Sequence, residues 1–294
     1  MTAATTAATA STEIFQGQPA VGLRLPCGDV AWVALQGAQV LSWVAGGRER
    51  LYLSPKALRD GHAAIRGGVP VCFPQFNQRG PLPKHGFARN LPWTVLPAEV
   101  RVAGEVTGGA TDTVQCRLQL CDSDATRALW PQAFEAVLTV QLRPGNLQVT
   151  LAVRNTGRQP LRFTGALHTY LAVDAIAAVQ LDGLQGQVGW DALTGQSGSV
   201  HSAITFNTEF DRVYSAAPRP LMLTDGPHRL QIAQSASFAD TVVWNPGAAL
   251  CGRLGDMPAD GFNRMLCVEA ARVVAPVTVP AGEIWQGWQR LTVL

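Results

Sequence analysis

The chain has 294 residues, of which 47% are hydrophobic, so it is long enough to bury a large core. Charged residues make up only 15% and the formal net charge is +2, which argues against a nucleic-acid-binding protein and its basic stripe. No apolar run approaches the roughly 18 residues that span a bilayer, so we expect no membrane contact.

The chain begins with MTAATTAATASTE, which lacks the basic and apolar stretches of a secretory signal and the arginines of a transit peptide. Its Ala/Thr bias predicts a disordered lead-in over residues 1–12, with ordered structure from near Ile14. Cysteines occur without any CxxC spacing, so zinc and redox motifs have no support. We expect reduced thiols and a cytoplasmic protein; the six cysteines are Cys27, Cys72, Cys116, Cys121, Cys251 and Cys267.

A strand-like run at 30–35 is followed by segment 61–93, which is rich in Gly and Pro and carries several cations. Arg66 precedes two glycines, which allow close backbone approach to a ligand, so its guanidinium could clamp an anion. Lys84, His85 and Arg89 fall within six residues and could surround a phosphate. A surface arginine before a turn, ordinary solvated charges and a structural histidine would give the same pattern.

The next runs, 114–120 and 134–142, alternate in the manner of half-buried strands. In 134–142 every even position is apolar, and the alternation resumes at Leu147. The intervening Arg143-Pro144-Gly145-Asn146 predicts a tight hairpin, because Pro presets the first turn dihedral and Gly supplies a positive φ.

Two candidate site residues follow. His168 stands among apolar residues in the run 161–173, so we expect it to be partly buried, either as a proton donor or acceptor or as a core histidine. Asp211 follows Phe210 and could accept hydrogen bonds from sugar hydroxyls or pair with Arg212. Trp93 and Trp244 could pack on a sugar, although core packing is the usual place of a tryptophan.

Further strand-like runs lie at 229–234, 241–244, 265–270 and 284–291. Glu269 shares a strand face with Met265 and Cys267, and burial there would raise its pKa and make it a stronger base. An outward-facing carboxylate at a sheet edge is an equally good interpretation. Because no long helical period appears, we predict an all-β fold, a large antiparallel β-sandwich that fills residues 13–294 as one domain.

Six segments together resemble one family. They are IRGGVPVCFPQF, LPKHGFARNLPW, ALHTYL, FDRVY, VVWNPG and MPADGFNRMLCVEAA. In this order they are similar to the motifs of the hexose-6-phosphate mutarotases, or glucose-6-phosphate 1-epimerases. These enzymes are a branch of the galactose-mutarotase-like proteins.

The resemblance implies a galactose-mutarotase-like supersandwich that needs no cofactor. It implies His168 as the catalytic acid and Glu269 as the catalytic base, with Arg66 and Arg89 near the substrate phosphate and Asp211 as a further substrate contact. Lys84 stands where the family commonly has Gln, so it could add a phosphate contact or change which sugar phosphate fits. His85 could touch the sugar or orient a neighbour.

Such a pair would interconvert sugar anomers by ring opening. Glu269 would take the proton from O1 and His168, as imidazolium, would protonate ring O5. The alternatives are an epimerase of free aldoses, a non-catalytic sugar-phosphate sensor, and a glycosidase, which needs a second carboxylate. No obligate partner is indicated, so we expect a monomer.

Overall fold

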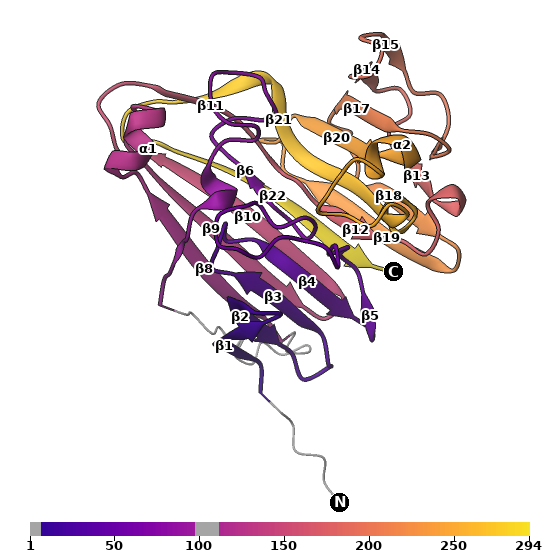
Figure 1. Ribbon diagram of the computed structural model, residues 1–294, viewed down its shortest axis with the longest axis horizontal. Helices are drawn as coiled ribbons and strands as arrows, with labels where there is room; N and C mark the ends of the chain where they lie inside the picture. The colour runs from indigo at the N-terminus through magenta and orange to yellow at the C-terminus, as the bar shows by residue number, and fades with distance from the viewer. Residues whose placement is uncertain (1–6, 98–111) are drawn as a thin grey trace, which may run out of the picture.

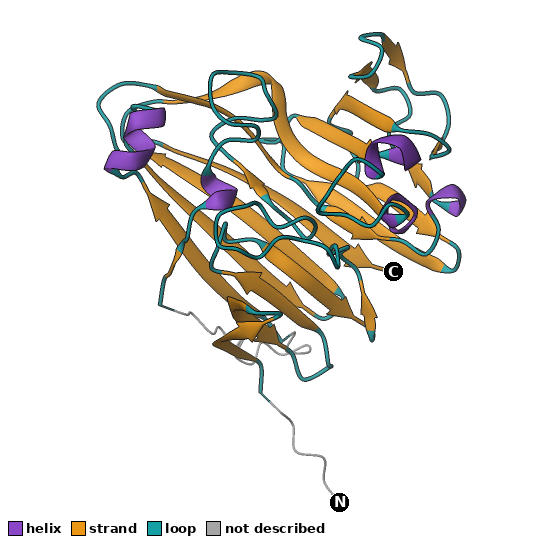
Figure 2. Ribbon diagram, in the orientation of Figure 1, coloured by secondary structure: helices purple, strands orange, loops and turns teal. Residues whose placement is uncertain are grey.

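The computed structural model describes residues 7–97 and 112–294, and β-strand is the dominant regular structure of this part of the chain (Figures 1 and 2). The α-helices described there are short: α1 spans Asp124–Leu129 and α2 spans Gly247–Cys251. Single 3-10 turns occur at Ala88–Asn90, Ile176–Ala178 and Gly261–Arg264. The all-β prediction is therefore confirmed.

Within the described residues the strands form three antiparallel sheets. The first has five strands in chain order: β1 (Thr9–Phe15), β2 (Gln18–Arg24), β3 (Val30–Ala34), β4 (Val40–Ala45) and β5 (Arg48–Glu49). The second has nine, in the order β16 (Ile204–Thr205), β13 (Gln180–Asp182), β18 (Leu221–Asp225), β19 (His228–Gln234), β22 (Ile284–Val293), β10 (Asn146–Asn155), β9 (Phe134–Arg143), β8 (Val114–Cys121) and β7 (Thr94–Val95).

The third sheet has eight strands and carries the site described below. Its order is β15 (Ser197–Ser199), β14 (Val188–Asp191), β17 (Phe210–Ser215), β20 (Asp240–Asn245), β21 (Met265–Val279), β11 (Leu161–Leu167) and β6 (Val71–Cys72), with β12 (Tyr170–Ala172) paired to β21.

The sheets pack face to face, as the predicted sandwich requires. Isolated bridges at Val40↔Val69 and Leu51↔Leu171 tie the five-stranded sheet to the eight-stranded side. The nine-stranded sheet forms the opposite layer, where β8 contacts β1 and β2, and β22 contacts β21. Apolar side chains on the inner faces of the strands supply most of the core between the layers, which includes Trp43, Leu138 and Val268.

The predicted hairpin is confirmed in position and register. β9 and β10 pair from Arg143↔Asn146 to Phe134↔Asn155, and Gly145 has the positive φ of 62° that the turn needs.

Strand β1 starts at Thr9, so the prediction of a disordered lead-in through residue 12 is wrong for Thr9–Thr12. These residues pair with β2, and the carboxylate of Glu13 accepts hydrogen bonds from Arg24. Residues 1–6 lie outside the described residues.

The cysteines carry free thiols in the structure, as expected. None of the helices in residues 7–97 and 112–294 has the length and hydropathy to cross a membrane.

Candidate active site

His168 lies at a break between two strands that share one register. Leu167, which ends β11, pairs with Ala270, and Tyr170, which begins β12, pairs with Cys267. Two residues lie between Leu167 and Tyr170, and two lie between Cys267 and Ala270. The register therefore continues across the break and places His168 directly opposite Glu269. Directly opposed residues on antiparallel strands project from the same face of the sheet, which is why these two side chains meet.

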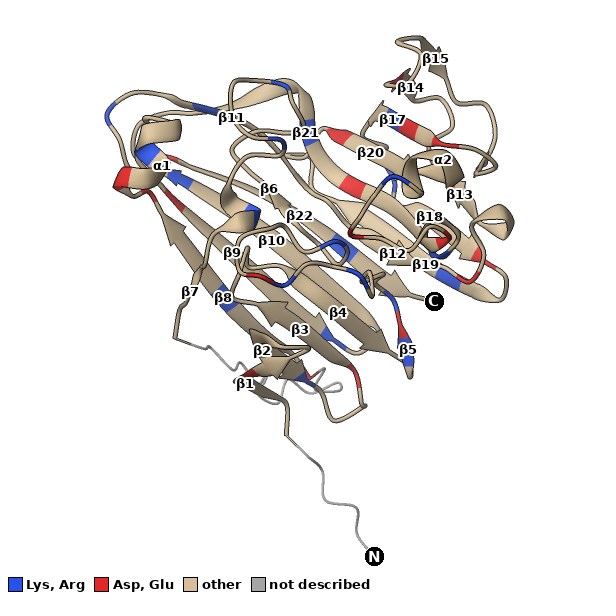
Figure 3. Ribbon diagram, viewed as in Figure 1, with Lys and Arg blue, Asp and Glu red and all other residues tan. Residues whose placement is uncertain are grey.

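The imidazole and the carboxylate are close and buried. Nε2 of His168 lies 3.4 Å from Oε1 of Glu269, and the two side chains are 9% and 1% exposed. Charged residues are sparse along the strands (Figure 3), and Glu269 is the one acidic residue of β21. A carboxylate in such a strand needs a partner, and His168 provides it.

Burial disfavours the charged form of both groups. It lowers the pKa of His168 well below its usual range, and nearby cations led by Arg89 lower that pKa further. Burial also raises the pKa of Glu269 well above its usual range; Asp211 adds to this shift and Arg89 opposes it. Both shifts have the same physical origin, because a buried site stabilises the neutral form of each group relative to its charged form.

Two buried polar atoms of this pair have no hydrogen-bond partner among the described residues. They are Nδ1 of His168 and Oε2 of Glu269. An unsatisfied buried polar atom costs about 1–3 kcal/mol, and sites of chemistry are where proteins retain such atoms.

Arg66 lies beside the pair but is already held by other groups. Its Nε donates to Oδ2 of Asp256 over 3.1 Å, and its Nη1 donates to the hydroxyl of Tyr170 over 3.0 Å. Although burial alone would lower the pKa of Arg66, Tyr170 and Asp256 raise it. The Tyr170 ring in turn stacks on His168, with centroids 4.8 Å apart and planes 12° apart.

Tyr170 and Asp256 were not among the residues predicted from the sequence. Tyr170 stands two positions after His168, so strand alternation could have placed it on the same face. Asp256 directly precedes the MPADGF motif, but only the folded chain brings it to Arg66.

The loop between β6 and β7 supplies two more predicted cations. Lys84 is exposed, and Arg89, which is partly exposed, donates from Nη2 to the Lys84 carbonyl over 2.9 Å. Arg89, Arg66 and Lys84 each lower the pKa of His168, so all three charges lie within electrostatic range of the imidazole.

His85 comes from the same loop and lies against the pair. Its ring centroid is 5.3 Å from that of His168, edge to face. Its Nδ1 accepts the backbone N–H of Asn77 over 3.2 Å, which assigns the proton of the neutral ring to Nε2. Its φ of 66° is unusual for a residue with a side chain, and burial together with His168 lowers its pKa. The backbone N–H of His85 also donates to the carbonyl of Asn77, so His85 and Asn77 hold the two sides of the loop together.

Asp211 belongs to the same face of the sheet. It pairs with Trp244, which pairs with Cys267, so these residues share the face of Glu269. Burial raises the pKa of Asp211, and Lys84 opposes that shift. The alternative that Asp211 pairs with its neighbour is wrong, because Arg212 points to the other face and binds Asp191 over 2.9 Å.

The two tryptophans considered from the sequence differ. Trp93 is core, 2% exposed, and its Nε1 donates to the carbonyl of Ala88. Trp244 is only half-buried and lies edge to face with His168, with centroids 6.0 Å apart. It alone of the two is placed where a sugar ring could pack.

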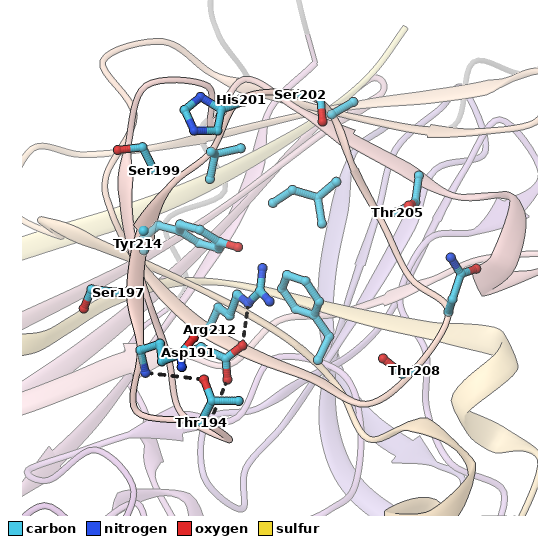
Figure 4. Close-up of a pocket in the computed structure, with 18 residues that line it drawn as sticks. Asp191, Thr194, Ser197, Ser199, His201, Ser202, Thr205, Thr208, Arg212 and Tyr214 are labelled. Carbon is cyan, nitrogen blue, oxygen red and sulfur yellow. Dashed lines mark hydrogen bonds and ion pairs between the residues drawn. The ribbon is translucent and has the colours of Figure 1, made fainter.

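A separate cavity of about 590 Å³ lies beside the β14–β15 hairpin (Figure 4). Hydroxyl side chains and the Asp191–Arg212 ion pair line it. From β17 it receives Phe210, Arg212 and Tyr214, which alternate with Asp211. The cavity and the acid–base pair therefore lie on opposite faces of that strand.

Comparison with known proteins identifies the family and agrees with the fold. Residues 22–292 match the family model described as aldose 1-epimerase. The chain belongs to the aldose 1-epimerase family. The resemblance found in the sequence is thus confirmed, and with it the isomerase class.

Two relatives are 36% identical to this chain. One, from Cenchrus ciliaris, aligns over 270 residues, covering 87% of this chain and 79% of the relative. The other, from Escherichia coli K12, aligns over 244 residues, covering 81% of this chain and 78% of the relative. Both carry the name "Putative glucose-6-phosphate 1-epimerase".

Solved structures share the whole fold. A "putative mutarotase" from Salmonella typhimurium superposes with a TM-score of 0.85 at 30% identity, covering 97% of this chain and 93% of that chain. A galactose mutarotase-like protein from Clostridium acetobutylicum gives a TM-score of 0.75 at 16% identity, covering 98% and 99%, which shows the fold alone.

Proposed function

We propose that this protein interconverts the α and β anomers of hexose 6-phosphates, chiefly glucose 6-phosphate. The observation that carries the proposal is the 3.4 Å approach of a buried imidazole to a buried carboxylate beside three cations. The names of the relatives support the phosphorylated substrate.

Anomer exchange needs one base and one acid on either side of C1. The Glu269 carboxylate takes the proton from O1, and the O–H electron pair becomes the second C1–O1 bond. The C1–O5 bond breaks as His168 gives a proton to O5. Rotation about C1–C2 and the reverse proton transfers then close the ring as the other anomer. Each positioned proton transfer contributes about 10²–10⁴-fold to the rate.

The substrate phosphate would also prepare the acid. Arg66, Lys84 and Arg89 repel a proton on His168 as long as no phosphate is bound. A phosphate carries a charge of about −1.5 to −2 at pH 7, so its binding would offset that repulsion. The pKa of His168 then rises toward its usual range, and the proton favours the imidazole over Glu269.

We assign Asp211 and His85 to contacts with sugar hydroxyls, since both lie beside the pair and each offers one polar group. We expect a monomeric, cytoplasmic protein that binds neither nucleic acid nor membrane. The free thiols support a reducing compartment.

Exchange NMR of equilibrated glucose 6-phosphate and of glucose tests the proposal. We expect faster anomer exchange with the phosphorylated sugar. Arg89→Ala should raise KM for glucose 6-phosphate about 10- to 100-fold, which is the effect of losing a charge-assisted hydrogen bond. The KM for glucose should stay unchanged, because glucose has no phosphate. Arg162→Ala, an exposed arginine on β11, is the control.

Two outcomes would count against it. Equal rates with both sugars that Arg89→Ala does not change would indicate an epimerase of free aldoses. Binding of glucose 6-phosphate without faster exchange would indicate a sensor.

A further inference from the structure

Three side chains of different donor type converge at the acid–base pair. The imidazole of His168, the thiol of Cys267 and the carboxylate of Glu269 each offer one atom, and these atoms all lie within 4.8 Å of one another. Alternation on β21 puts Cys267 and Glu269 on one face, and the shared register brings His168 across from them. All three residues are buried, and the thiol is free.

This donor set is one that suits zinc. Zn²⁺ binds imidazole nitrogen at about 2.0–2.1 Å, carboxylate oxygen at about 2.0–2.2 Å and thiolate sulfur at about 2.3 Å, in tetrahedral geometry. A nitrogen and an oxygen ligand of one tetrahedral ion therefore lie about 3.4 Å apart, and Nε2 of His168 lies 3.4 Å from Oε1 of Glu269. The thiol sulfur lies within 4.8 Å of both residues' ligand atoms.

The charges also balance. A thiolate and a carboxylate together cancel the two positive charges of the ion, so the complex adds no net charge beside Arg66 and Arg89. Mg²⁺ and Ca²⁺ prefer sets made only of oxygen, so the thiol and the imidazole select against them. Three protein ligands leave the fourth position of zinc to water.

We propose that His168, Cys267 and Glu269 form an inhibitory zinc site in the substrate-free protein. The ion occupies the nitrogen and the oxygen that anomer exchange would use, and so it competes with the sugar phosphate. The inhibition rests on the proposed function, whereas the binding of the metal does not.

The test uses the full chain, freed of metal with a chelator. Cys267→Ala removes one ligand, and Cys251→Ala is the matched control, a buried thiol of the same apolar cluster outside the ligand group. Titration with Co²⁺ alone should produce a thiolate-to-cobalt absorption band in the wild type and in Cys251→Ala, and no such band in Cys267→Ala.

Zn²⁺ should slow anomer exchange of glucose 6-phosphate in the wild type, and chelator should restore the rate. The zinc concentration for half inhibition should rise with sugar phosphate, and it should be at least about tenfold higher in Cys267→Ala, the effect of losing about 1.4 kcal/mol of binding. Mg²⁺ should not inhibit, and metal-free rates of wild type and Cys267→Ala should agree.

Equal inhibition of Cys267→Ala, or a cobalt band that survives in this variant, would overturn the site. A cobalt band in the wild type with no zinc inhibition would overturn the inhibitory role. If the metal-free protein shows no anomer exchange, the proposed function fails, and the cobalt titration alone decides whether the site exists.

Discussion

The Glu269 carboxylate has few structural contacts: Oε1 lies 3.4 Å from Nε2 of His168, and Oε2 has no hydrogen-bond partner among the described residues. Replacing it with Gln keeps the size of the buried group and removes the base, so we expect Glu269→Gln to lower kcat for anomer exchange about 10²–10⁴-fold with little change in KM. Exchange NMR at saturating glucose 6-phosphate measures this. Glu283→Gln, an exposed carboxylate before β22, should keep its full rate. A fall in kcat of less than about fivefold would remove Glu269 from the reaction.

Asp211 should set the acidic limb of the pH profile. After burial, its charge is the main cause that raises the pKa of Glu269. Asp211→Asn removes that charge, so the pKa of Glu269 falls, the carboxylate persists to lower pH, and the acidic limb of kcat/KM moves to lower pH. A profile of kcat/KM against pH measures the shift, and Glu209→Gln, whose charge acts on Asp211 instead, is the control. An unmoved limb would refute the coupling.

Single residues were predictable from the sequence only when a motif contained them. His168 and Glu269 stand in motifs, but His168 also fitted a core histidine and Glu269 an outward-facing edge residue until the register between β11, β12 and β21 placed them opposite one another. That register is a long-range pairing, which local pattern does not encode. The link from Arg66 to Asp256 is long-range in the same way.

At the scale of elements, alternation located strands well and their ends less well. The run 161–173 reads as one strand, but the structure divides it into β11 and β12, where the backbone N–H of Thr169 turns back to the carbonyl of Leu167. On either side of this break, the backbone N–H groups of His168 and Tyr170 donate to the 61–93 loop. The sequence marked that loop as functional without showing where its backbone would attach.

Gly86 fixes that loop beside the pair. Its φ is 74°, and a Cβ there would overlap the carbonyl oxygen of Phe73, which accepts the N–H groups of Phe87 and Ala88. We expect Gly86→Ala to lower the free energy of unfolding by more than the roughly 1–2 kcal/mol of left-handed strain alone, as measured by urea denaturation.

Gly61→Ala is the matched control for this change. Gly61 has a φ of 78° and no atom within 4 Å of a built Cβ, so it should show the strain without the overlap. Equal losses of stability in the two variants would contradict the account.

For the molecule as a whole, ionisation of the buried Glu269 carboxyl group lowers the free energy of unfolding. The folded-state pKa of Glu269 is raised, so its contribution to stability is complete below its ordinary pKa of 4.5 and is lost as pH rises through the folded-state value. The Gln side chain of Glu269→Gln stays neutral, so at pH 8 the free energy of unfolding of this variant should exceed that of the wild type. The expected difference is about 1.4 kcal/mol for each unit by which folding raises the pKa of Glu269.

The difference between Glu269→Gln and the wild type should shrink as pH falls below 4.5 and be smallest near about pH 3.5, where the Glu269 side chain is protonated in both the folded and the unfolded state. Urea denaturation at the two pH values measures it, with Glu283→Gln as an exposed control. A stability difference that does not vary with pH would show that ionisation is not its cause.

Strand β22 joins the two halves of the nine-stranded sheet, since it pairs with β19 on one side and β10 on the other. Every other described strand leaves the ribosome before it does. Until β22 emerges, the nascent chain carries two long, unpaired edges that can template aggregation. A chain truncated before residue 284 would keep the edges of β19 and β10 unpaired. We expect chaperones to bind such a chain and proteases to degrade it.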